Sequence, residues 1–258
     1  MIPVIRMTGG LSAVGCASLR DLLSKMVPSG SKRGSGVPLI APAMMLGRAE
    51  ALPILNNIWA PAGSALIHET QTFRRSCALQ PEQELGLQFD KKHVETAIEL
   101  NFGILCDDVP VGNMQSRLRL VSQETISALK GSIFPERLNG PHVVWQMTAD
   151  FGRSEVGEYL RLSGDPNPIH RDDTAAQAVG LEKAVVPGMM IAGILEYILP
   201  TEAVSEQKIR FMAPVSVGQS LRLGILTRGE GMRRIFVVRT DGVLAAIADI
   251  TLNLERIA

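Results

Sequence analysis

The sequence predicts an α+β chain made of two similar halves, each with a long antiparallel sheet curved around one buried helix. Two observations lead to this prediction. A Met-Met pair two residues after a proline occurs at Pro42 and again at Pro187, 145 residues apart, in apolar surroundings. Segments with the alternation and β-branched content of strands follow each copy. A repeated helix-then-strands unit therefore organises the chain.

The two proline segments predict the helices. Both are rich in helix-forming apolar residues, and proline is tolerated in the first turn of a helix because its missing N–H would have no partner there. Apolar residues on all sides indicate a helix inside the molecule, not on its surface. We therefore expect one buried helix at the start of each strand series.

The strand-like segments are bounded by glycine, proline or charged residues, which mark turns. In the first half they are 65–75, 94–106 and 114–121, and in the second half 209–213, 221–228, 234–240 and 243–254. One central helix followed by long antiparallel strands, twice over, is the arrangement of a double hot-dog fold. We place the N-terminal hot-dog at 1–130 and the C-terminal one at 131–258, with 122–141 as the connection and 27–37 as a mobile loop.

The segment Ser163–His170, with sequence SGDPNPIH, carries the main functional signal. Asp165 and His170 stand five residues apart, with two prolines between them that exclude ordinary helix or central strand. The segment must be a stiff, irregular loop. Two rigidly held groups of acid/base character are what proton transfer at a carbon centre requires.

A second signal lies downstream, where the helix that begins near Pro187 starts with Gly188 and Met189. A helix start offers free backbone N–H groups and the positive end of the helix dipole. Gly188 has no side chain, so a carbonyl oxygen can approach its N–H closely. An acid/base pair next to N–H donors suits chemistry beside a carbonyl.

Residues 159–190 resemble the signature of the MaoC-like, (R)-specific enoyl-thioester hydratase/dehydratase family. The matching positions are Tyr159, Ser163, Gly164, Asp165, Asn167, Pro168, Ile169, His170, Asp172, Ala176, Gly180, Leu181, Gly188 and Met189. The family has histidine before Gly-Met, whereas this chain has Pro187. That histidine is not the family's proton-transfer residue, so the departure bears on the shape of the oxyanion loop and on substrate range.

The resemblance implies the double hot-dog fold and a hydro-lyase that interconverts a trans-2-enoyl thioester and an (R)-3-hydroxyacyl thioester, on coenzyme A or acyl carrier protein, in fatty acid or polyketide metabolism. It assigns the proton transfers to Asp165 and His170, and Gly188 and Met189 to the thioester oxygen. Asn167 is expected to brace the loop through a side-chain hydrogen bond to the backbone, with a water or thioester contact as the second interpretation.

The two halves differ at the site. Applying the offset of 145 to Asp165 and His170 leads to Arg20 and Lys25, and Ala43 stands where the second half has Gly188. The first half is therefore expected to be a degenerate copy that supplies a substrate-binding wall. One active site per chain follows.

Two other functions stay open. One is a non-catalytic partner subunit or a specialised tailoring dehydratase, for which Pro187 is the support. The other is a thioesterase, which needs a carboxylate on the central helix facing the thioester. Glu196 is the only acid on that helix and lies two turns beyond Gly188.

Composition restricts the other classes of function that the protein could have. The formal net charge is zero with no long basic block, which gives nucleic-acid binding no support. Three widely spaced cysteines fit a reducing compartment, and the other histidines lack partners at metal-ligand spacing. We expect no metal, no cofactor, no membrane span and no signal peptide, hence a cytoplasmic enzyme, with a homodimer left open.

Overall fold

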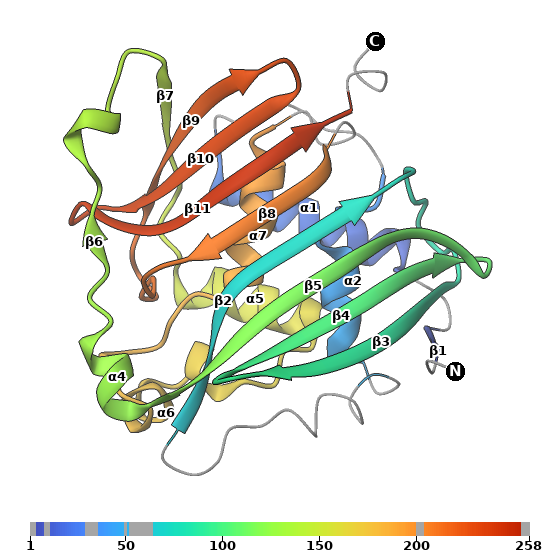
Figure 1. Ribbon diagram of the computed structural model, residues 1–258, viewed down its shortest axis with the longest axis horizontal. Helices are drawn as coiled ribbons and strands as arrows, with labels where there is room; N and C mark the ends of the chain where they lie inside the picture. Colours follow the sequence, from blue (N-terminus) through green and yellow to red (C-terminus); the bar gives the residue numbers. More distant parts are fainter. Residues whose placement is uncertain are drawn as a thin grey trace.

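The computed structural model describes residues 4–7, 11–28, 36–48, 51, 64–199 and 204–253. Within these ranges eleven strands form one sheet, and helices lie against one of its faces (Figure 1). Ten strands follow one another in the order β1-β3-β4-β5-β2-β8-β11-β10-β9-β7, and β6 pairs with β11. All the recorded strand pairings are antiparallel.

The strand order repeats itself. The N-terminal strands are β1 (Val4–Met7), β2 (Ser64–Arg75), β3 (Leu85–Val94), β4 (Ala97–Cys106) and β5 (Val109–Ser122). The C-terminal strands are β7 (Val143–Met147), β8 (Val204–Phe211), β9 (Leu221–Gly229), β10 (Met232–Arg239) and β11 (Val243–Leu252), preceded by the short β6 (Ser132–Ile133). Each set runs outward from its first long strand, β2 or β8, to a short edge strand, so both halves have the same topology.

The two halves meet where β2 pairs with β8. This pairing runs from Thr70 opposite Arg210 to Arg74 opposite Glu206, and it makes the two half-sheets continuous (Figure 1). Side chains of these strands alternate between the face that the helices cover and the open face. We call this junction the seam, and its helix-covered side the inner face.

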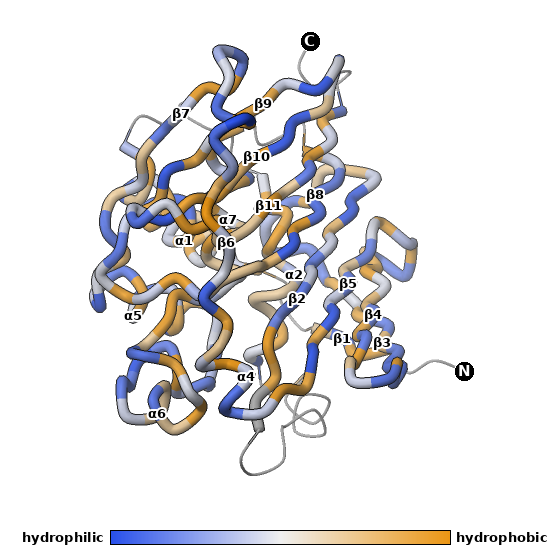
Figure 2. Tube along the Cα trace, turned by 60° about the vertical axis from the view of Figure 1, so that its left-hand side comes forward, coloured by the Kyte–Doolittle hydropathy of each residue, from blue (hydrophilic) through white to orange (hydrophobic). Residues whose placement is uncertain are grey.

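Four helices lie behind the sheet in Figure 1: α1 (Ala13–Met26), α2 (Ala41–Met44), α5 (Arg153–Ser163) and α7 (Gly188–Tyr197). The smaller elements are η1 (Met45–Gly47), α4 (Gln123–Ala128), η2 (Glu136–Leu138), η3 (Pro168–His170) and α6 (Asp173–Ala178). Every residue of α7 from Met190 to Tyr197 is buried, and hydrophobic segments gather around this helix in Figure 2. The prediction of a buried central helix is thus confirmed for the second half.

The first half differs in detail from the prediction. Its helix at Pro42 is only the four-residue α2, which continues as the 3-10 turn η1. The strand β3 lay in no predicted segment, because its polar second part, DKKHV, has no apolar alternation. Most of the loop predicted at 27–37 lies outside the described residues.

The offset of 145 residues, taken from the two proline segments, does not match the other helices of the two halves to each other. Arg20 and Lys25 lie within α1, which corresponds to α5 and not to the loop after it. The counterpart of the Asp165–His170 loop is the segment that follows α1. Its sequence from Val27 to Ile40 contains no acid and no histidine, so the first half still lacks the pair, for a different reason.

The connection between the halves contains α4, β6 and η2. Phe134 from this segment packs against Trp145 and Phe236 in a small second core on the outer face of the C-terminal strands. A domain boundary at 130/131 remains a prediction. No helix within the described ranges is long and apolar enough to cross a membrane.

Candidate active site

The loop after α5 is built by its own sequence. Helix α5 ends at Gly164, whose φ of +66° is the left-handed conformation that glycine adopts without strain. The backbone of Gly47, from η1 of the first half, packs so closely against Ser163 and Gly164 that a side chain at position 47 would collide with them. The first half therefore supports the loop immediately before Asp165.

Asn167 braces the loop as expected. Its side-chain Oδ1 accepts a hydrogen bond from the N–H of Ile169 at 3.3 Å, and its own N–H donates to Oδ1 of Asp165 at 2.9 Å. Arg171 adds a bond to the Asp165 carbonyl at 2.7 Å. These contacts fix the backbone around Asp165 and leave its Oδ2 for other partners.

The loop places Asp165 and His170 together. Nε2 of His170 lies 3.7 Å from Oδ2 of Asp165, which is too long for a direct hydrogen bond but suits one water molecule in contact with both. The His170 side chain is 12% exposed and that of Asp165 is 32% exposed. The pair is thus sheltered on the imidazole side and open to water on the carboxylate side.

The tautomer of His170 follows from its other nitrogen. Nδ1 lies 2.8 Å from the carbonyl oxygen of Val185, and because a carbonyl only accepts, Nδ1 carries the hydrogen. Burial lowers the pKa of His170, an effect that the nearby Asp165 carboxylate opposes. The imidazole is therefore neutral near pH 7 and presents a lone pair at Nε2.

The Val185 contact also joins the loop to α7. The N–H of Val185 donates to the carbonyl of Ile169 at 3.0 Å, and the N–H of Ala184 donates to Asp173 at 2.8 Å. Helix α7 begins three residues after Val185, with Pro187 as its N-cap. The segment 184–187 thus brings the start of α7 beside the Asp165/His170 pair.

Gly188 and Met189 form the first turn of α7. The Pro187 carbonyl accepts hydrogen bonds from the N–H groups of Met190 and Ile191. The N–H groups of Gly188 and Met189 have no acceptor among the residues that the structure describes. Free N–H groups at the positive end of a ten-residue helix suit an oxyanion. A Cβ on Gly188 would lie 3.0 Å from the Phe211 ring, so the glycine also serves packing.

The neighbouring residues have structural roles. Tyr159 is 2% exposed within α5, and burial, with the nearby charge of Asp165, raises the pKa of its phenol. Asp172 caps α6 by accepting from Thr174 N–H at 2.8 Å. Tyr159 therefore packs within the core, and Asp172 serves as a helix cap.

Glu196 is engaged elsewhere. It is 1% exposed, and both carboxylate oxygens lie 2.8 Å from the N–H of Leu39 in the first half. Eight residues of helix place it about 12 Å along the axis from Gly188. Glu196 therefore links α7 to the first half, which removes the support for a thioesterase carboxylate.

Two residues near the site had no signal in the sequence. His68 of β2 and Phe211 of β8 form a ring contact with centroids 5.2 Å apart across the seam, and Phe211 covers Gly188. Their proximity depends on the pairing of strands from opposite halves, which no local spacing reveals.

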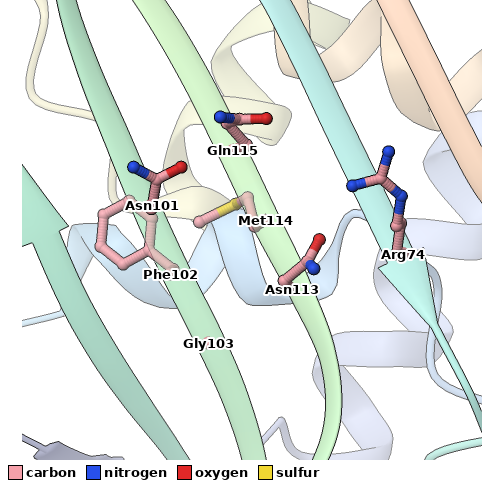
Figure 3. A pocket seen from close by; sticks show the side chains of 7 residues that line it. All are labelled: Arg74, Asn101, Phe102, Gly103, Asn113, Met114 and Gln115. Carbon is pink, nitrogen blue, oxygen red and sulfur yellow. The ribbon is translucent and has the colours of Figure 1, made fainter.

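A separate cavity of about 280 Å³ lies on the N-terminal strands (Figure 3). Its lining residues are Arg74, Asn101, Phe102, Gly103, Asn113, Met114 and Gln115. It shares no residue with the loop or with α7, and its cation Arg74 is paired with Glu206 at 2.9 Å. Convergent polar groups and the perturbed histidine instead make Asp165 and His170 the candidate site. No group of three or more metal-ligating side chains occurs within the described ranges.

Comparisons with known proteins show what the chain is similar to. Residues 141–246 match the model of the MaoC like domain. The (R)-specific enoyl-CoA hydratase of Aeromonas caviae is 29% identical over 82 residues, which is 30% of this chain and 61% of that protein. The mitochondrial 3-hydroxyacyl-[acyl-carrier-protein] dehydratase of Arabidopsis thaliana is 29% identical over 87 residues, 32% of this chain and 52% of that protein. The chain thus spans between half and two thirds of these relatives.

The fold extends over nearly the whole chain. The crystal structure of HtdX from Mycobacterium tuberculosis superposes with a TM-score of 0.74, covering 96% of this chain and 99% of that one at 16% identity. At this identity the likeness establishes the fold alone. The chain has the α+β double hot-dog fold, and its residues 141–246 are similar to the MaoC like domain.

Proposed function

We propose that the protein is a hydro-lyase that adds water to a trans-2-enoyl thioester to give an (R)-3-hydroxyacyl thioester, and catalyses the reverse dehydration. The observation that carries this proposal is the 3.7 Å separation of Asp165 Oδ2 and His170 Nε2, with Nδ1 held by Val185. The stereochemistry and the thioester class come from the family.

The pair accounts for the proton transfers. Both Oδ2 and Nε2 are acceptors, so a water molecule between them donates its two hydrogens and keeps a lone pair for C3. As the C3–O bond forms, one acceptor takes a proton from the water, and the proton returned to C2 completes the addition. Both groups end as they began. Positioned acid/base groups typically contribute about 10²–10⁴-fold to a rate.

The start of α7 accounts for the stabilisation of the negative charge that develops on the thioester oxygen. Attack at C3 moves electrons onto the thioester oxygen, and the N–H groups of Gly188 and Met189 are free to donate to it. Such prepositioned donors are each worth about 3–4 kcal/mol in the transition state. The oxygen meets them because Gly188 has no side chain in the way.

The acyl carrier is coenzyme A or acyl carrier protein. The two curated relatives support this range, one being named for an enoyl-CoA and the other for an acyl-carrier-protein substrate. A cytoplasmic location, a homodimer and a role in fatty acid or polyketide metabolism remain predictions that no observation here tests.

A panel of trans-2-enoyl thioesters on both carriers tests the proposal. Loss of absorbance of the conjugated double bond measures hydration, and release of free thiol measures hydrolysis in the same samples. We expect hydration without hydrolysis, and an (R)-3-hydroxy product by chiral analysis. Thiol release as the main reaction would make the protein a thioesterase, and no reaction on any substrate would favour the non-catalytic or specialised alternative that Pro187 suggests.

A further inference from the structure

A histidine of the first half, His68, stands beside a β-bulge in β2. Strand β2 pairs with β5 in register up to His68 opposite Leu118, and the register then shifts so that Thr70 stands opposite Arg117. This β-bulge leaves Glu69 as the extra residue, which forms ion pairs with Arg117 and Arg119 on the outer face. Bulges re-aim side chains near functional sites.

The bulge turns His68 to the inner face. Its cross-strand partner Leu118 packs against the main core, as does Leu66 two residues earlier in β2, and residues that stand opposite each other share a face. The ring of His68 contacts that of Phe211, which covers Gly188. His68 is thus separated from the start of α7 by one aromatic ring.

One nitrogen of this imidazole has no partner. Although the residue as a whole is only partly buried, Nε2 is buried and lacks a hydrogen bond within the described part of the chain. A buried polar atom without a hydrogen bond is destabilising, so a group that is kept in this state indicates a partner that binds there. Burial lowers the pKa of His68 to about 4, although interactions with Gln71 and the Thr70 backbone oppose the shift, and the ring is neutral near pH 7.

The surroundings of His68 are polar for an inner face. Gln71 and Ser116 are both buried there and are joined by a bond of 2.6 Å from the serine hydroxyl to the glutamine Oε1. Their polar atoms are engaged with each other and with the Thr72 carbonyl. Nε2 of His68 is therefore a group of this seam that is left for a ligand, as is the buried Oε1 of Gln207 on β8.

We propose that His68 is a specificity-determining residue of the site, and that its Nε2 binds a hydroxyl group on the acyl chain of the substrate. The inference rests on the proposed function for the position of the thioester. A plain hydrocarbon chain would leave Nε2 unpaired, whereas a hydroxyl both donates and accepts and so suits either neutral tautomer of the ring. The substrate class is then a hydroxylated enoyl thioester, recognised jointly by the two halves.

Matched substrates test the inference. Pairs of trans-2-enoyl-coenzyme A thioesters of equal chain length are compared, one plain and one with a hydroxyl on a carbon beyond C3, with that carbon varied. We expect wild type to prefer one hydroxylated position by about tenfold in kcat/KM, the effect of one buried hydrogen bond. His68→Leu removes the preference, His68→Gln keeps part of it, and the exposed-site control His142→Leu keeps all of it.

A binding measurement separates this inference from the proposed function. Saturated acyl-coenzyme A thioesters, with and without the hydroxyl, are titrated calorimetrically into each variant. A preference in binding that His68→Leu abolishes supports the inference even if no enoyl thioester is hydrated. Equal affinity of folded wild type for both members of every pair, or a preference that survives in folded His68→Leu, overturns the inference whether or not hydration is observed.

Discussion

The two halves of the molecule share one topology but differ in the segment that follows their first helix. In the second half α5 leads into a loop with Asp165 and His170, and then to the ten-residue α7. In the first half α1 leads into a segment without acid or histidine, and then to the four-residue α2. The comparison teaches that the two halves share the sheet scaffold, while the proposed chemistry depends on one loop and one helix start that only the second half has.

The first half nevertheless contributes to the site. Gly47 packs against the end of α5, and the N–H of Leu39 donates a hydrogen bond to Glu196 of α7. His68 contacts the ring of Phe211 across the seam. A half without an acid/histidine pair after its first helix thus makes contacts that support and border the candidate site of the other half. The predictions below test this division of roles.

The largest effect is expected from the catalytic pair. Asp165→Asn and His170→Ala should each lower kcat by about 10²–10⁴-fold, since each removes one of two groups that handle the same proton transfers. The double variant should be little worse than either single variant, because residues that act in one step are non-additive. Steady-state kinetics on the best substrate measure this. A single variant with near wild-type kcat would remove that residue from the mechanism.

A methyl group on Gly188 should have the next largest effect. Its Cβ would lie 3.0 Å from the Phe211 ring and beside the N–H that we propose to face the thioester oxygen, so Gly188→Ala should lower kcat by about 10²-fold. The matched control is Gly157→Ala in α5, where a Cβ meets nothing within 4 Å. This control should keep full activity and gain about 0.5–1 kcal/mol of stability from the better helix propensity. Equal kinetics for the two variants would refute an oxyanion site at Gly188.

The pH profile tests the state of His170. The mechanism needs the neutral ring, and burial lowers the pKa of His170 below its ordinary value. Activity should therefore be retained as pH falls through about 6.5, the ordinary histidine pKa, and be lost only at lower pH. The pH dependence of kcat/KM gives the answer, with protein stability followed across the same range. An acidic limb centred above the ordinary histidine pKa would contradict the neutral-histidine account.

Pro187 should have the smallest effect. As the N-cap of α7 it donates no hydrogen bond, and its carbonyl already serves Met190 and Ile191. Pro187→His should therefore keep hydration and shift the preference among acyl chains mainly through KM, the pattern of altered uniform binding. A rise in kcat by orders of magnitude on simple enoyl thioesters would instead favour the specialised-function alternative.

Local sequence was enough to predict the loop and the central helix of the second half, although strand β7 lay in no predicted segment. The prolines between Asp165 and His170, the glycine that ends α5 and the start of α7 all act within a few residues, so the loop and its acid/base pair were predictable. The carbonyl of Val185, which sets the tautomer of His170, was not, because a backbone group has no sequence signature. The roles of His68 and Phe211 depend on pairing between strands more than one hundred residues apart in the chain.

The errors in the first half have related causes. Strand β3 ends in charged residues and lies between better-patterned strands, so alternation alone did not reveal it. A single offset placed Arg20 and Lys25 opposite the catalytic pair because the segments between matching elements differ in length in the two halves. Repeats of this kind align by element and not by residue count.

The central claim is that the chain has one active site, in its second half. Equilibrium titration with a tight, non-reactive acyl-thioester analogue tests it directly, using the whole chain and a variant with both Asp165→Asn and Gly188→Ala. The account predicts saturation at one ligand per chain for wild type and a marked loss of affinity in the variant. Two equivalent sites per chain, or a single site that the variant leaves unchanged, would contradict it.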